Sequence, residues 1–116
     1  SRQVVCTDLV AAYIVRIVEA TRSHPGIKLG SSPRGSIALY KLSRAYALAQ
    51  GRNYVLPDDV KYLAPYVLGH RIILTHEMKN EKKTAAGVIK DIVKDIAVPV
   101  DPNQPKSYHE QSVYAN

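Results

Sequence analysis

The stretch Gly30-Ser31-Ser32-Pro33-Arg34-Gly35-Ser36 decides where the central helix of this chain begins. Ser32 is a preferred N-cap residue and Pro33 suits the first helical position, so a helix is predicted to start here. Arg34 then lies in the first turn, among N–H groups without intrahelical partners and at the positive end of the helix dipole. A cation there costs about 0.3–1 kcal/mol when it has no partner. A phosphate suits both the N–H groups and the guanidinium, so this helix start is predicted to bind an anion.

Apolar residues at helical spacing predict four helices, one of which starts at this point. They are expected at residues 8–23, 33–50, 57–69 and 84–96. Pro65 should kink the third helix or change it to a tighter turn near Ala64. Residues 54–55 and 71–75 are candidates for a short pairing of strands. The predicted fold class is therefore all-α: a small helical bundle of about four helices, with one short two-stranded pairing as an option, and an extended or disordered C-terminal tail.

The predicted helix at residues 33–50 has two distinct sides. A seam of small and apolar residues is expected to pack closely against a neighbouring helix; it consists of Ala38, Leu42, Ala45 and Ala49. Arg34 and Lys41 are seven residues apart and nearly eclipse each other, with Arg44 close to the same line. The basic side chains are therefore expected to form a row that begins at the helix start.

The formal net charge is +6, and residues 16–52 account for all of it. In this segment one acidic residue, Glu19, stands against seven basic residues: Arg16, Arg22, Lys28, Arg34, Lys41, Arg44 and Arg52. This imbalance favours an anionic partner, although a solvated basic face without a ligand explains it equally well. The single cysteine, Cys6, cannot form an internal disulfide, which indicates a cytoplasmic protein. No apolar run approaches the roughly 20 residues of a membrane span.

The chain lacks the residues that hydrolyse a nucleotide. It contains no G-x-x-x-x-G-K-[ST] phosphate loop and no strand that ends in acidic residues, so it is not expected to be catalytic on its own. No metal site is predicted, because the four histidines lack the spacing of metal ligands: His24, His70, His76 and His109. Asp58 and Asp59 are explained by their place at a helix start.

Four blocks of sequence follow one another with suitable spacing. They are Y-I-V with A-T-R-S-H-P at 13–15 and 20–25, G-S-S-P-R-G at 30–35, G-R-N-Y-V-L-P-D-D-V at 51–60, and H-R at 70–71. Together they resemble the C-terminal helical lid of MoxR-family AAA+ ATPases, apart from Asn53, where the family usually has Asp. The resemblance implies a lid domain at residues 1–98 and says nothing about the tail at residues 99–116.

The resemblance also implies a function. Arg34 falls on the sensor 2 position, from which an arginine reaches the γ-phosphate of ATP, and the supporting helix N-terminus consists of Gly30, Ser31, Ser32 and Pro33. Four further arginines could contact a neighbouring subunit or the core, or pair within the domain: Arg22, Arg44, Arg52 and Arg71. ATP and Mg²⁺ would be bound mainly by a separate AAA+ core domain. The implied partners are that core, neighbouring subunits of a hexameric ring and a von Willebrand factor A-type protein, with no membrane.

Two other functions fit the residues. A small basic helical domain could bind nucleic acid, with an affinity that falls steeply with salt, but no base-reading side chains are arranged on an exposed helix. A plain protein-interaction bundle would instead lock Arg34 to a carboxylate of its own fold.

Overall fold

The computed structural model describes residues 3–100, which form helices and one small sheet. The elements are α1 (Asp8–Thr21), β1 (Ile27–Leu29), α2 (Pro33–Ala49), α3 (Pro57–Gly69), β2 (Ile73–Leu74), α4 (His76–Asn80) and α5 (Ala85–Asp95). The predicted helical bundle with one short strand pairing is confirmed, and the five-residue α4 is an addition to it. The tail expected at residues 99–116 lies outside the described residues from position 101 onward. Within residues 3–100, no helix has both the length and the apolar character needed to cross a bilayer.

The helices begin where local sequence signals place them. Four N-cap side chains accept a hydrogen bond from a backbone N–H in the following first turn: Thr7, Ser32, Thr75 and Thr84. Each of these bonds satisfies an N–H that has no intrahelical partner. Gly51, with a φ of 81°, takes the left-handed conformation just beyond α2 and ends that helix.

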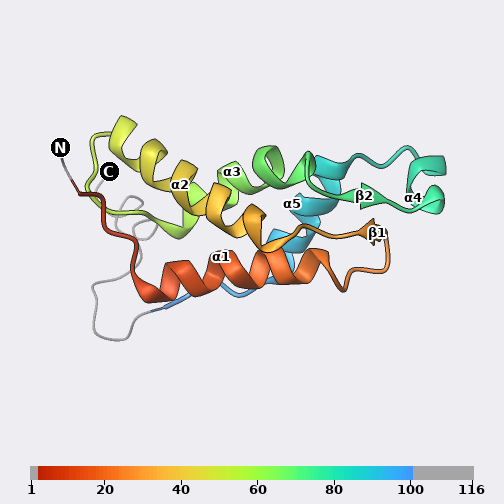
Figure 1. Cartoon of the computed structure of the whole chain (residues 1–116), viewed down its shortest axis with the longest axis horizontal. Coiled ribbons are helices and arrows are strands. Elements are labelled where there is room, and N and C mark those ends of the chain that lie inside the picture. The colour runs from red at the N-terminus through yellow and green to blue at the C-terminus, as the bar shows by residue number, and fades with distance from the viewer. Residues whose placement is uncertain (1–2, 101–116) are drawn as a thin grey trace, which may run out of the picture.

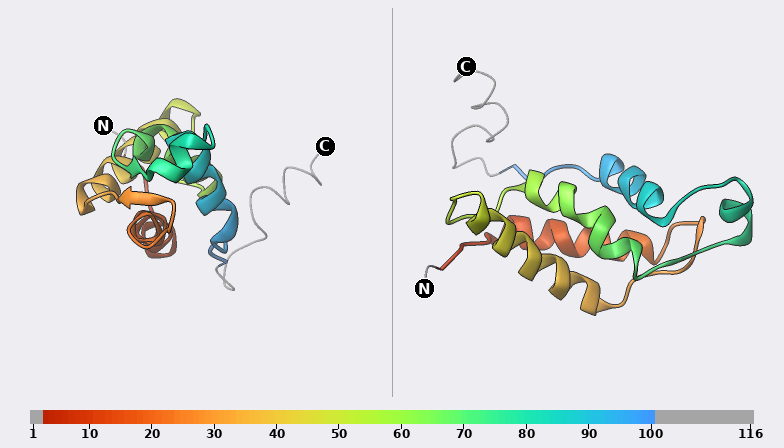
Figure 2. Two further views of the ribbon diagram at one scale, coloured as in Figure 1. Left: turned by 90° about the vertical axis from the view of Figure 1, so that its right-hand side faces the viewer. Right: turned by 90° about the horizontal axis from the view of Figure 1, so that it is seen from above.

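The core lies between α1 and the other three long helices. α2, α3 and α5 lie side by side in that order, and α1 packs against all three (Figures 1 and 2). Large side chains with less than 2% exposure fill the space between them, among them Tyr13, Ile14, Ile17, Leu39, Leu68 and Ile89. β1, β2 and α4 extend beyond one end of these helices (Figure 1).

The observed strand pairing differs from the expected one. β1 pairs antiparallel with β2, with Ile27 opposite Leu74 and Leu29 opposite Ile73. α3 explains why residues 54–55 and 71–75 do not meet: it remains α-helical through Pro65 to Gly69, so of the two expectations near Ala64, a kink or a tighter turn, the tighter turn is wrong. A helix of 13 residues is about 20 Å long, so the segments at its two ends lie far apart.

Residues 54–55 pair instead with the start of the chain. The Val5 N–H donates to the Asn53 carbonyl at 2.8 Å, and the Val55 N–H donates to the Val5 carbonyl at 2.9 Å. These bonds close the end of the bundle opposite the strand pair (Figure 1).

α2 buries a different row of residues from the predicted seam. The buried row consists of Gly35, Leu39, Ser43 and Ala47. Leu42 is 44% exposed, and Ala45 and Ala49 are exposed as well. The predicted seam is therefore wrong: the small residues that allow close packing in the core are Gly35 and Ser43, and the row with Leu42 faces outward.

Candidate functional site: the start of α2

The segment before α2 is fixed against the end of α1. A Cβ atom at Gly30 would lie 2.6 Å from the Thr21 carbonyl oxygen and 2.7 Å from the Arg22 Cα. Both are backbone atoms, so no side-chain movement could make room for it. Position 30 therefore requires glycine for close approach.

Ser31 holds the same junction through hydrogen bonds. It is 1% exposed, and its N–H donates to the Thr21 Oγ1 at 2.9 Å. The Thr21 hydroxyl in turn donates to the Val18 carbonyl at 2.6 Å. The Ser31 hydroxyl donates to the Ser32 carbonyl at 2.9 Å, and a Cβ at Gly35 would overlap the Ser31 Oγ. Since all these groups are close-packed or hydrogen-bonded, the first turn of α2 has a fixed place relative to α1.

Most of the first-turn N–H groups expected to be free are already satisfied. Pro33 has none, the Arg34 N–H donates to the Ser32 Oγ at 3.3 Å, and the Gly35 N–H donates to the Ser32 carbonyl at 2.9 Å. An anion at this helix start would therefore be held chiefly by a side chain and by the helix dipole rather than by these N–H groups.

Arg34 is the side chain placed to do so. It is exposed, and its guanidinium makes no hydrogen bond or ion pair within residues 3–100. The first turn of α2 contains no acidic residue that would offset its charge. The described part of the chain thus shows an uncompensated cation on a fixed helix start, and it does not show the internal carboxylate partner that a plain interaction bundle would require.

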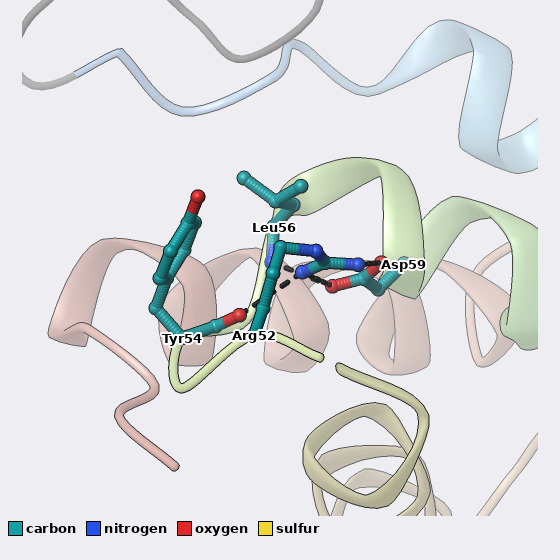
Figure 3. Close-up of polar contacts among 4 residues, drawn as sticks. All are labelled: Arg52, Tyr54, Leu56 and Asp59. Atoms are coloured by element: carbon teal, nitrogen blue, oxygen red, sulfur yellow. Dashed lines mark hydrogen bonds and ion pairs between the residues drawn. The ribbon is translucent and has the colours of Figure 1, made fainter. Parts of the chain in front are cut away.

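Arg52, by contrast, is committed to the fold. Its two terminal nitrogens contact the two Asp59 carboxylate oxygens at 2.8 and 2.6 Å, and it also donates to the Tyr54 carbonyl at 3.0 Å (Figure 3). Asp59 accepts a further hydrogen bond from the Leu56 N–H at 2.8 Å. This bidentate pair connects the α2–α3 loop to the first turn of α3.

The other three candidate contact arginines, Arg22, Arg44 and Arg71, fall into two groups. The Arg44 Nε donates to the Val4 carbonyl at 2.9 Å, and its guanidinium lies 5.5 Å from the centre of the Tyr40 ring. Arg22 and Arg71 are exposed. The structure therefore gives Arg44 and Arg52 intradomain contacts and leaves Arg22 and Arg71 accessible.

An open groove lies between α2 and the end of α3, and sequence reasoning missed it. One wall consists of Ala38, Lys41, Leu42 and Ala45 from α2. The other consists of Tyr66, Val67, His70 and Arg71. Its volume is about 790 Å³. The sequence signal for this groove is the predicted seam of small and apolar residues on α2. The sequence favours placing that seam in the core, because α2 has two apolar rows and the sequence does not show which of them is buried.

No group of three or more His, Cys, Asp or Glu side chains within residues 3–100 could hold a metal ion. Burial raises the pKa of the Cys6 thiol, with a smaller opposing effect from Arg44, so the thiol is not activated as a nucleophile. Burial, with a smaller contribution from Asp58, raises the pKa of Tyr13 to about 12, so this hydroxyl stays protonated near neutral pH.

The sequence of this helical domain matches a protein-family model. The model of the AAA lid domain matches residues 19–96. The chain belongs to that family. The lid so defined includes the last three residues of α1, the whole of α2, α3 and α5, and the groove.

Individual relatives agree with this assignment. The lid is 50% identical over 93 residues to the uncharacterized protein YeaC of Bacillus subtilis, a match that covers 80% of this chain and 29% of YeaC. It is 34% identical over 96 residues to the chaperone MoxR1 of Mycobacterium tuberculosis, covering 75% of this chain and 26% of MoxR1. The lid is therefore homologous to MoxR-family proteins over most of its length.

A solved structure supports the fold as well. The lid superposes with a TM-score of 0.78 and 31% identity on a crystal structure of a protein from Cytophaga hutchinsonii that is assigned as an ATPase. The match covers 84% of this chain and 32% of that one. The chain thus spans less than a third of the length of each of these three relatives.

Proposed function

We propose that this lid works in a MoxR-like AAA+ ATPase and that Arg34 is its sensor 2 residue, which contacts the γ-phosphate of ATP. The observation that carries the proposal is the exposed Arg34 guanidinium, without a partner among residues 3–100, on a helix start fixed by Gly30 and Ser31. Arginine suits this role because it remains charged and can grip two phosphate oxygens with parallel hydrogen bonds.

The proposed mechanism is a change of contact between two nucleotide states. ATP and Mg²⁺ are bound mainly by a core domain that supplies the phosphate loop and the acidic metal ligands. Arg34 binds the γ-phosphate and holds the lid closed; when hydrolysis removes that phosphate, this contact is lost and the lid reorients. In a hexameric ring the lid movements would be passed to neighbouring subunits. The assembled ring would act in the cytoplasm as a chaperone-like assembly factor, together with a von Willebrand factor A-type partner.

The test uses a longer protein in which this lid is joined to its ATP-binding core. Arg34→Ala removes one charged donor to the γ-phosphate, which is expected to cost about 1.5–3 kcal/mol in both the ATP-bound and the transition state, or roughly a 10- to 150-fold loss of ATP turnover measured as kcat/KM. Arg34→Lys keeps the charge without the two-pronged geometry, so its turnover should fall between those of the wild type and the alanine variant.

The matched control is Arg16→Ala, which removes an exposed arginine from α1. Its turnover should equal that of the wild type. Wild-type turnover in Arg34→Ala, or equal losses in Arg34→Ala and Arg16→Ala, would show that Arg34 is not the nucleotide sensor. Far-UV circular dichroism of the 116-residue chain should be unchanged by both substitutions, because neither side chain is buried.

A further inference from the structure

The groove between α2 and α3 has the residue spacing of a second helix-packing face. Ala38, Lys41, Leu42 and Ala45 follow the spacing i, i+3, i+4 and i+7, which places them on one side of α2. The core-facing row of the same helix is a separate one. α2 therefore has two faces suited to helix packing, and in the described structure only one of them is covered.

Large side chains at this groove remain open to solvent. Leu42 is 44% exposed and Tyr66 is 61% exposed. The aromatic surface continues from Tyr66 to Tyr62, with ring centres 5.7 Å apart, and on to Tyr46 at 5.4 Å. Tyrosine and arginine are enriched at the energetic centres of protein interfaces.

The charge around the groove has one sign. Its lining includes Lys41 and Arg71 and contains no carboxylate. The two helices explain why: α2 has no acidic residue, and α3 has none after Asp59. The surface thus combines an apolar floor with a cationic rim, which is complementary to a helix with apolar side chains on one face and carboxylates beside them.

We propose that this groove is a docking site for an acidic amphipathic helix of a partner protein. The helix would place apolar side chains between Leu42 and Tyr66 and acidic side chains beside Lys41 and Arg71. The open shape and the long aromatic continuation favour a helix over a small molecule, which usually requires a more enclosed pocket. This inference does not depend on ATP or on Arg34, so it can fail while the proposed sensor function stands.

The test measures binding of synthetic peptides to the isotope-labelled 116-residue chain by NMR. The first peptide has Leu at helical i, i+3, i+4 and i+7 positions and Glu at the others; the second has the same composition in scrambled order; the third has Lys in place of Glu. The first should cause saturable shifts in residues 38–45 and 66–71. The scrambled peptide should bind at least tenfold more weakly, and the basic one should not bind.

Leu42→Glu should weaken binding of the acidic peptide at least tenfold, because it puts a carboxylate on the apolar floor of the groove, where it repels the glutamates of the peptide. Leu9→Glu is the matched control: Leu9 is 42% exposed, nearly the same as Leu42, but lies on α1. It should leave binding unchanged. Both variants should stay folded, since neither leucine is buried.

Several results would overturn the proposal. One is the absence of saturable shifts in the groove with the acidic peptide, and another is equal binding of the scrambled or basic peptide. Tighter binding by a chain truncated after Val100 would identify residues 101–116 as the occupant. Loss of binding when the lid is joined to its core would make the groove an internal contact, and self-association abolished by Leu42→Glu would make it an interface between copies.

Discussion

Replacing Asp59 by alanine should destabilise the lid more than any change at an exposed charged residue. Asp59 accepts three hydrogen bonds, two from Arg52 and one from the Leu56 N–H, and its side chain is 4% exposed, against 16% for Arg52. Breaking a buried ion pair by removing one partner costs about 3–5 kcal/mol. Because Arg52 keeps its bond to the Tyr54 carbonyl and some contact with water, we expect about 3 kcal/mol, at the lower end of that range.

The measurement is urea unfolding followed by far-UV circular dichroism. With an m-value of about 1.5 kcal/mol/M, a loss of about 3 kcal/mol lowers the unfolding midpoint by about 2 M. Asp58→Ala is the control in the same helical turn: Asp58 is exposed, so only its interaction with the helix dipole is lost, about 0.3–1 kcal/mol. A double-mutant cycle with Arg52→Ala should give a coupling free energy of at least about 1 kcal/mol. A midpoint shift below about 0.5 M for Asp59→Ala, or no coupling, would refute the assignment of this pair as a structural tie.

Other predictions concern positions in or against the packed interior. Gly30→Ala should cost about 2 kcal/mol or more in the free energy of unfolding, because backbone atoms block the new methyl group. At Gly69 the new Cβ would lie 3.6 Å or more from its neighbours, so Gly69→Ala should be neutral or stabilising by up to about 1 kcal/mol. Thermal unfolding of the two variants tests this difference. In the folded state the pKa of Tyr13 is about 12, above the ordinary value of 10.0. The contribution of Tyr13 to the free energy of unfolding is therefore complete below pH 10 and is lost as the pH rises toward 12. This loss amounts to roughly 2–3 kcal/mol. Between pH 10 and 12 the urea midpoint of Tyr13→Phe should therefore fall less than that of the wild type. An equal fall of the midpoint with pH in both proteins would contradict the effect of burial on Tyr13. Ser43→Ala should be neutral or stabilising by up to about 1 kcal/mol, because the buried Ser43 Oγ has no hydrogen-bond partner in the described structure; a clear loss of stability would show that it has one.

The positions of the helices could be predicted because their signals are local. Ser32 and Thr84 lie directly before the turns that they cap, and Gly51 marks the end of α2. The place of Arg34 in the first turn of α2 also followed from local reasoning, because Ser32 and Pro33 mark where the helix starts. That the first-turn N–H groups of Arg34 and Gly35 are already hydrogen-bonded, so that an anion there would be held chiefly by the guanidinium, could not be seen without the bonds made by Ser32.

The remaining features depend on contacts between distant segments. The sequence does not show that Ile27 meets Leu74, because neither strand is long enough to have a periodic pattern of its own. It also does not distinguish the two apolar rows of α2, since a buried Ser43 looks less suited to a core than Leu42 does. The second role of Asp59, as the partner of Arg52, was hidden because its position at a helix start already explained it.

The two backbone pairings at opposite ends of the bundle have a consequence for how the chain refolds. β1 and β2 are more than 40 residues apart in the sequence, and so are Val5 and Tyr54, so neither pairing can form within a short local segment. Such non-local closure raises the contact order above that of a bundle joined only by short loops, and higher contact order slows folding. The lid should therefore refold in one cooperative step, more slowly than an up-and-down helical bundle of similar length.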